Sequence, residues 1–262
     1  MSRVIVITSG KGGVGKTSVT LGIGRGLSAM GYKTLLIDTD MGLNNLDVLM
    51  KVEDKIVFDI SDVADARCRP RQALVEDPDC ENLMILPSVR GYRKNEVSGQ
   101  MLRAIINSLQ GFDYTLIDCP AGIELGFHRA VSAASEALVV TTPHISAVKD
   151  AGKVIGILGT YKIDARLIVN RVRGDMVLDG EMASPDDIRQ ALGIPLCGII
   201  PENDEINALS ANGEKPKSGG NGSKAFSLLC HNIVYGTSDM YDYTAGYKGI
   251  FGGIKRALKK HL

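Results

Sequence analysis

The sequence predicts an α/β fold, in which a single doubly wound, mostly parallel sheet carries a P-loop and an amphipathic helix follows at the C-terminus. Short apolar runs recur along the chain, and segments with a helical period separate most of them. Runs that are apolar on both faces are typical of strands covered by helices on both sides. Their alternation with helices indicates right-handed β-α-β units in one domain of about seven strands.

The individual elements follow from these patterns in chain order. The first apolar run, 4–8, precedes a segment of helical period at 17–30. Further strands are expected at 34–37, 83–86, 115–117, 137–140, 167–169 and 196–200, and further helices at 97–109, 148–158 and 224–235. The stretch 218–223 is rich in glycine and serine, which predicts a loop before the last of these helices.

The apolar period is lost after the last of these helices. Residues 236–246 therefore look like a linker between a P-loop domain at 1–235 and a terminal helix at 247–262. The first strand begins at Val4, which leaves no space for a signal peptide, and no run of 18 apolar residues occurs. These features predict a cytoplasmic protein that does not span a membrane.

Composition places the chain among globular proteins that bury a sizeable core, with 262 residues of which 44% are hydrophobic and 23% charged. The 30 basic and 30 acidic residues cancel, but residues 247–262 hold five basic residues and no acidic one. Residues 1–246 therefore hold 25 basic and 30 acidic residues. An acidic body gives no reason to expect nucleic-acid binding.

The five cysteines argue against a disulfide framework and against a zinc or iron-sulfur cluster within one chain. They are odd in number, lie far apart in the sequence, and never form a C-x-x-C pair. We expect reduced thiols, and we expect Cys119 to be a packing residue rather than a nucleophile.

The strongest motif is GKGGVGKT at 10–17, which matches G-x-x-x-x-G-K-[ST] between the first strand and the first helix. Its glycines let backbone N–H groups approach phosphate oxygens at a helix N-terminus. Lys16 reaches the β- and γ-phosphates, and the Thr17 hydroxyl binds Mg²⁺. A glycine-rich turn without a ligand is the alternative, but strand, loop and helix together favour nucleotide binding. The glycines are Gly10, Gly12, Gly13 and Gly15.

Two aspartates stand at predicted strand ends. Asp38 follows 35–37 and Asp118 follows 116–117, and open α/β sheets bind ligands at this carboxyl edge. We expect Asp118 to hold Mg²⁺ through water together with Thr17, as a Walker B residue, and Asp38 to order the magnesium shell. An aspartate at a strand end is otherwise an ordinary turn residue.

A second lysine, Lys11, is not required by the general P-loop pattern. The sequence KGGVGKT at 11–17 is therefore more specific than that pattern. Together with DTDMGLNNLD at 38–47 and DCPAGIE at 118–124, it gives the chain a resemblance to the deviant Walker A ATPases. Within them the chain most resembles the septum-site-determining MinD ATPases of bacterial division, from Ser2 to the tail. Residues 41–47, which contain Gly42 and two asparagines but few core positions, and residues 120–122, which follow Asp118, look like switch loops that respond to the γ-phosphate.

The resemblance implies a role for several residues. Lys11 would reach the phosphates of a second subunit, so that two ATP molecules lie between two protomers, and Asp40 would position or deprotonate the attacking water. The nucleotide contacts would extend through Val14 and Ser18, with Asn170, Arg171, Pro201 and Glu202 beside the adenine. The alternatives are a solvated Lys11 and an ordinary polar strand end at 170–171.

The tail, KGIFGGIKRALKKHL, is amphipathic when placed on a helix. Its apolar residues recur at helical spacing on one face, and basic residues occupy the other. This pattern is typical of a helix that lies in the interface of an anionic membrane. One tail is expected to bind weakly, and two tails on an ATP-bound dimer to bind with avidity. The apolar face comprises Ile250, Phe251, Ile254, Leu258 and Leu262, and the basic face Lys255, Arg256, Lys259 and Lys260.

The resemblance implies a Mg-ATPase that dimerises on ATP and attaches to the inner face of the cell membrane. There it would recruit a MinC-like division inhibitor and respond to a MinE-like topological factor. Asp150 is present, but Gly152 stands where some MinD proteins carry a further acidic residue, so the sequence does not decide which inhibitor or activator docks on this helix.

The alternatives to this function are a flagellar-number ATPase, which usually has an extension before the first strand, a ParA-type DNA-segregation ATPase, and metabolic P-loop or nitrogenase-reductase relatives. A terminal helix packed on the body is the alternative for the tail.

Overall fold

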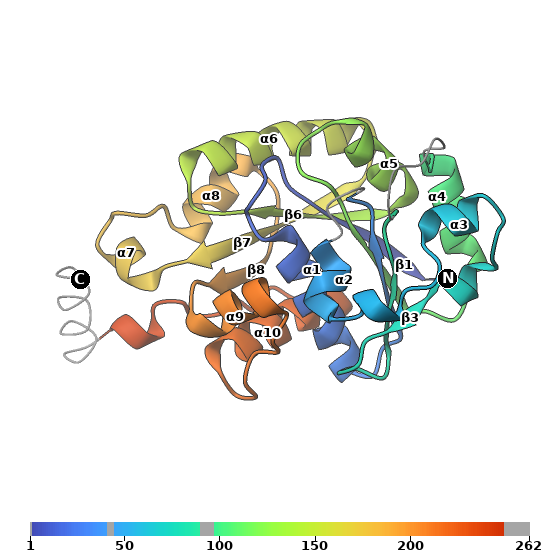
Figure 1. The fold of residues 1–262 in the computed structure, drawn as a ribbon. Helices are drawn as coiled ribbons and strands as arrows, with labels where there is room; N and C mark the ends of the chain where they lie inside the picture. The colour runs from blue at the N-terminus through green and yellow to red at the C-terminus, as the bar shows by residue number, and fades with distance from the viewer. Residues whose placement is uncertain (1, 41–44, 90–96, 249–262) are drawn as a thin grey trace.

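Eight strands form one central sheet in the order β3-β4-β2-β5-β1-β6-β7-β8 (Figure 1). This computed structural model describes residues 2–40, 45–89 and 97–248. All neighbouring strands are parallel except β3 and β4. The strands are β1 (Arg3–Thr8), β2 (Thr34–Asp38), β3 (Val75–Glu76), β4 (Leu83–Leu86), β5 (Tyr114–Asp118), β6 (Glu136–Thr141), β7 (Asp164–Val172) and β8 (Leu196–Pro201).

The predicted fold class is confirmed, but the expected number of strands is one too low. The additional strand, β3, has only two residues and pairs antiparallel with β4, Val75 opposite Ile85 and Glu76 opposite Met84. A strand of this length is too short to produce an alternating or uniformly apolar pattern. The sequence therefore gives no sign of this strand.

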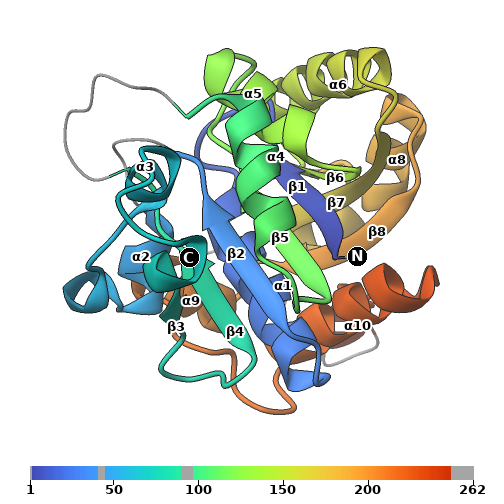
Figure 2. The same cartoon turned by 90° about the vertical axis from the view of Figure 1, so that its right-hand side faces the viewer.

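Helices cover both faces of the sheet (Figure 2). One face packs against α1, α2, α9 and α10, and the other against α3, α4, α5 and α6. The helices are α1 (Lys16–Ala29), α2 (Asn45–Met50), α3 (Ile60–Ala64), α4 (Gly99–Ser108), α5 (Leu125–Ala133), α6 (Ile145–Thr160), α7 (Gly174–Leu178), α8 (Pro185–Leu192), α9 (Asp204–Asn212) and α10 (Asn221–Tyr235). Three short 3-10 turns are η1 (Glu53–Lys55), η2 (Pro70–Ala73) and η3 (Ala245–Tyr247).

A buried arginine ties three segments together on the α1 face. Arg25 of α1 is only 7% exposed, and its Nε donates to Oδ2 of Asp77 at 3.0 Å. The same guanidinium reaches Asp79 and donates to the carbonyl of Gly213. The side chain of Asp77 is fully buried. Arg25 therefore joins α1 to the loop after β3 and to the end of α9.

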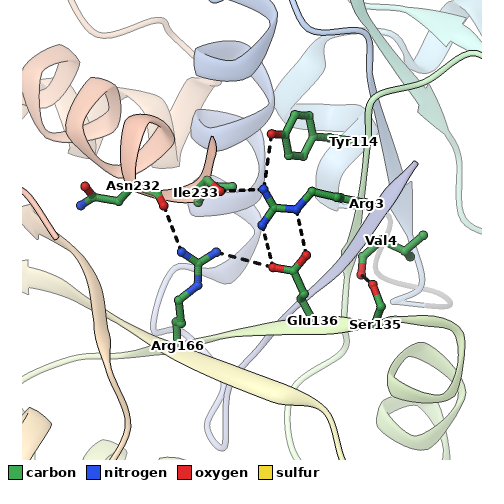
Figure 3. Close-up of polar contacts among 8 residues, drawn as sticks. All are labelled: Arg3, Val4, Tyr114, Ser135, Glu136, Arg166, Asn232 and Ile233. Carbon is green, nitrogen blue, oxygen red and sulfur yellow. Dashed lines mark hydrogen bonds and ion pairs between the residues drawn. The ribbon is translucent and has the colours of Figure 1, made fainter. Parts of the chain in front are cut away.

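The end of α10 is held at the amino edge of the sheet (Figure 3). Arg3 of β1 forms a bidentate pair with Glu136 of β6, at 2.9 and 2.8 Å, and also donates to the Ile233 carbonyl at 2.7 Å. Arg166 of β7 donates to the Asn232 carbonyl at 3.1 Å. These bonds fix the C-terminal turn of α10 to three strands, at the edge opposite the P-loop.

The segment predicted to be a linker, 236–246, lies against the body. The Asn232 side chain donates to the Asp239 carbonyl at 2.8 Å and accepts its N–H at 3.0 Å. Met240 and Tyr243 pack on the apolar cluster of β7, β8 and α8, and a Cβ at Gly174 would collide with the Tyr243 carbonyl. The described chain thus returns from the amino edge of the sheet to α7, beside the carboxyl end of β7.

The terminal residues 249–262, which carry the amphipathic pattern, lie outside the described residues, as do 41–44 of the first predicted switch loop. No helix within the described ranges has the length and apolar character needed to cross a membrane.

Candidate nucleotide-binding site

The P-loop lies at the carboxyl edge of the sheet, between β1 and α1 (Figure 1). Gly13 and Gly15 have φ values of 77° and 92°, a left-handed conformation that glycine adopts without strain. Gly15 is the N-cap of α1, and its carbonyl accepts the Val19 N–H at 2.9 Å. The loop thus delivers its backbone N–H groups to the positive end of a 14-residue helix, which is a favourable site for phosphate.

Neighbouring elements pack so closely on this loop that two of its glycines cannot carry a side chain. A Cβ at Gly10 would collide with the backbone of Asp150 on α6, and one at Gly15 would lie 2.5 Å from Nδ2 of Asn170. That amide donates to the Val14 carbonyl at 2.8 Å. The structure therefore places Asn170, at the end of β7, directly against the P-loop.

The other residues expected near the adenine lie at the ends of two neighbouring strands, β7 and β8. Val172 of β7 is in register with Pro201 of β8, and the Glu202 N–H donates to the Val172 carbonyl at 3.0 Å. Arg171 has a φ of 58°, where the register between β7 and β8 is irregular. The structure thus brings Asn170, Arg171, Pro201 and Glu202 together at one end of the sheet; their contact with adenine stays a prediction.

The aspartates predicted at strand ends lie side by side, because β2 and β5 are neighbours and Asp38 is in register with Asp118. Asp118 is 2% exposed, and its Oδ1 accepts from the Thr20 hydroxyl at 3.1 Å. The carboxylate of Asp38 accepts the Asp40 N–H at 2.9 Å and the Leu46 N–H at 3.3 Å. Both predicted magnesium-shell residues therefore have fixed positions beside the P-loop.

Burial controls the electrostatics of these acids. It raises the pKa of Asp118 to about 6, against hydrogen bonds from Thr17 and Thr20 and the charge of Lys16, which lower it. Burial and then repulsion by Asp118 raise the pKa of Asp38 well above its usual range. Burial also raises the pKa of Asp40, which the charge of Lys16 partly offsets. Ionisation of these buried carboxyl groups is therefore unfavourable in the free protein, and a bound cation would favour it.

The residues present fit a magnesium-bound nucleotide. Carboxylate and hydroxyl oxygens are the donors that Mg²⁺ prefers, and the Thr17 hydroxyl is near enough to Asp118 to lower the pKa of that carboxyl. Among the described residues no cluster of three or more His, Cys, Asp or Glu side chains is able to hold a metal by itself. That agrees with the usual Mg²⁺ site, which is completed by phosphate oxygens and water.

Lys11 differs from Lys16 in its surroundings. Lys16 is 8% exposed within α1, whereas Lys11 is exposed and its Nζ donates to the Ser146 hydroxyl of α6 at 3.0 Å. Ile145, beside Ser146, is 89% exposed. The second lysine thus lies on the outer surface of the site, next to an exposed apolar residue.

Sequence reasoning missed two hydroxyls beside Asp118. Thr20 lies one turn after Lys16 on α1 and donates to the Lys16 carbonyl at 2.9 Å as well as to Asp118. Helical spacing from the P-loop lysine was a signal that pointed to it. The hydroxyl of Thr39 donates to the Asp118 carbonyl at 2.7 Å, a contact that depends on strand order and leaves no pattern in the sequence.

Comparison with known proteins decides the family. The family model for the CobQ/CobB/MinD/ParA nucleotide binding domain matches residues 5–216. This chain belongs to that family. The septum site-determining protein MinD of Bacillus subtilis is 44% identical over 218 residues, which cover 82% of this chain and 81% of the relative. The chain is thus a MinD-family P-loop ATPase, and its nucleotide and metal are ATP and Mg²⁺.

Two solved structures of MinD proteins share the fold. The MinC:MinD cell division protein complex of Aquifex aeolicus has a TM-score of 0.83 and 38% identity, over 91% of this chain and 97% of that one. MinD from Pyrococcus horikoshii, complexed with Mg-ADP, has a TM-score of 0.80 and 31% identity, over 90% and 97% of the chains. The latter supports the fit of the P-loop and its acids to a magnesium nucleotide.

The remaining candidate at this edge, Cys119, has the packing role that we expected. Its side chain is buried next to Asp118, and burial raises the pKa of its thiol to about 12. A thiol that stays protonated at neutral pH is a poor nucleophile. Of the two adjacent side chains at the β5 end, Asp118 therefore stays the predicted functional one.

Proposed function

We propose that this MinD-family ATPase dimerises when it binds ATP, attaches to the inner membrane surface through its C-terminal helix, and helps to place the division septum by recruiting a division inhibitor. The observation that carries this proposal is the position of Lys11. It is a P-loop lysine that lies exposed on the surface of the site, where its Nζ donates to the Ser146 hydroxyl of the N-terminal turn of α6 at 3.0 Å.

An exposed apolar rim supports a second copy as the partner of this surface. Ile123 and Leu125, which follow Asp118, are 41% and 69% exposed, and Ile145 next to Ser146 is 89% exposed. Exposed apolar side chains beside a charged site are typical of surfaces that another protein covers. A lysine supplied across such an interface stabilises negative charge on a phosphoryl group in the transition state, as an arginine finger does.

Within one protomer the roles follow from position. Lys16 and the loop N–H groups hold the phosphates, Thr17 and Asp118 hold the metal, and Asp38 orders its shell. Bound Mg²⁺ supplies neutralisation of the phosphate charge. Asp40 accepts a proton from the attacking water or orients that water, and its raised pKa makes its carboxylate a better base.

The membrane step follows from the distribution of charge. The body carries more acidic than basic residues, and the basic amphipathic pattern begins directly after Lys248, the last described residue. One such helix binds an anionic surface weakly, and two held on one dimer bind it with avidity. A MinC:MinD complex is known from a similar protein, which supports an inhibitor of the MinC type as the recruited partner. A topological factor of the MinE type is a further proposed partner.

Lys11→Ala tests the dimer. In sedimentation velocity with a non-hydrolysable ATP analogue, we expect the variant to stay monomeric, because it lacks the cation that contacts the phosphates bound to the other subunit. Its nucleotide affinity as a monomer should change by no more than about threefold, since Lys16 and the loop N–H groups remain. Lys33→Ala is the matched control, because Lys33 is exposed at the opposite edge of the sheet. A Lys11→Ala protein that dimerises like the wild type would contradict the proposal.

A further inference from the structure

Asp38 and Asp118 lie side by side where β2 and β5 end, because the two residues are in register. Asp40 follows two residues after Asp38, and its N–H donates to the Asp38 carboxylate at 2.9 Å. Asp38 and Asp40 belong to the β2 end, whereas Asp118 belongs to the β5 end. The β2–β5 ladder pairs the two strands as far as Asp38 and Asp118. The position of Asp40 relative to Asp118 therefore depends on the contacts made just beyond that pair.

Thr39 makes two such contacts. Its backbone N–H donates to the Asp118 carbonyl at 3.1 Å, and its side-chain hydroxyl donates to the same oxygen at 2.7 Å. The residue is 8% exposed, so water competes little for these bonds. A carbonyl oxygen has two lone pairs, and Thr39 can occupy both. The backbone bond continues the β2–β5 ladder beyond Asp38, and the hydroxyl adds a second bond at its last step.

The position of Asp40 depends on this tie. Asp40 follows Thr39 directly, and its N–H donates to the Asp38 carboxylate at 2.9 Å. The Leu46 N–H donates to the same carboxylate at 3.3 Å. A rotation of the backbone at Thr39 would move the Asp40 carboxylate relative to Lys16 and Asp118. Displacements of about 1 Å at a catalytic group reduce rates by about a hundredfold.

We infer that the Thr39 hydroxyl is a positioning group for ATP hydrolysis, which fixes the Asp38–Asp40 segment to the end of β5 and so places Asp40 at the phosphate site. The inference rests on the proposed role of Asp40 and adds to it. Thr39 acts through Asp40 and does not itself touch the nucleotide, so its loss should reduce kcat rather than the affinity for ATP.

The experiment compares Thr39→Val, which removes the hydroxyl but keeps the shape, with Thr39→Ser, which keeps it. We expect Thr39→Val to lower the single-turnover rate of Mg-ATP hydrolysis by about tenfold with a Kd for ATP within about twofold of the wild type. Thr39→Ser should retain a rate within about threefold. Thr34→Val is the matched control, because Thr34 is a buried threonine at the other end of β2 whose hydroxyl donates to the Tyr32 carbonyl.

Two results for Thr39→Val would overturn the inference. One is a Thr39→Val rate within twofold of the wild type. The other is a rate that falls no more than that of Thr34→Val, which would show a general effect of strand stability. Asp40→Asn, measured alongside, tests the proposed role separately. If Asp40→Asn hydrolyses ATP normally, the proposed role of Asp40 fails, and the inference that rests on it is overturned as well. If Asp40→Asn is slow while Thr39→Val is normal, only the inference about Thr39 fails.

Discussion

Asp118→Asn is expected to raise the free energy of unfolding of the nucleotide-free protein at pH 7 and to reduce ATP hydrolysis by about a hundredfold or more. The two effects have one cause. Asp118 is fully buried beside Asp38, so its charge is costly until a cation arrives, and the same charge is needed to hold that cation. A pKa of about 6 against the usual 3.8 corresponds to about 3 kcal/mol at pH 7. We expect a gain of about 1 to 3 kcal/mol.

The dependence on pH has a definite sign. Between the usual pKa and the raised one, folded Asp118 binds a proton that the unfolded chain does not bind. Wild-type stability from this group therefore falls as pH rises from about 4 to about 6. The advantage of Asp118→Asn should be largest at pH 7 and shrink toward pH 4.

Urea unfolding at several pH values, without nucleotide or Mg²⁺, measures this difference. Asp54→Asn is the control, because Asp54 is exposed in η1 and its replacement should change stability by less than about 0.5 kcal/mol. A variant that is less stable than the wild type at pH 7 would show that the Asp118 charge is already compensated in the free protein.

Arg25→Met should be among the most destabilising single substitutions, with a loss of about 3 to 5 kcal/mol. The change removes the partner of Asp77, whose side chain has no exposure, and leaves a carboxylate and the Gly213 carbonyl without their arginine. Because Arg25 joins α1 to the end of α9, its loss should destabilise the packing of the helices on the α1 face of the sheet.

The double variant Arg25→Met/Asp77→Leu separates the value of the pair from the penalty of an isolated charge. It should recover most of the lost stability, since a buried ion pair is often worth no more than apolar residues of similar volume. Arg67→Met is the control, because Arg67 is 45% exposed and pairs with Asp62 and Asp65 at the surface. It should cost less than about 1 kcal/mol. An Arg25→Met effect as small as that of Arg67→Met would contradict this account of the tie.

The main features of the site were predictable because they are local. A P-loop is defined by adjacent residues, and Asp38 and Asp118 each end an apolar run that marks a buried strand. The sheet then brings such ends to one edge, whatever the strand order, because its strands are parallel. The same logic explains why Asn170 and Pro201 lie at the same edge of the sheet, at the ends of the neighbouring strands β7 and β8.

Other contacts were not predictable, because they depend on which elements become neighbours. Thr39 meets Asp118 only because β2 lies beside β5, and Arg25 meets Gly213 across most of the chain. The packing of 236–246 was missed for a different reason. Met240 and Tyr243 are too few to give a period, and the Asn232 side chain, rather than a run of apolar residues, anchors the segment.

The central claim is that ATP controls membrane attachment through the tail. Co-sedimentation of the full chain with vesicles of phosphatidylglycerol and phosphatidylethanolamine tests it most directly. We expect about tenfold more protein to sediment with ATP than with ADP, because only the dimer presents two tails. The ATP effect should vanish with phosphatidylcholine vesicles, in Lys11→Ala, and after deletion of 249–262. Equal binding with ATP and ADP, or binding that survives the deletion, would contradict the account.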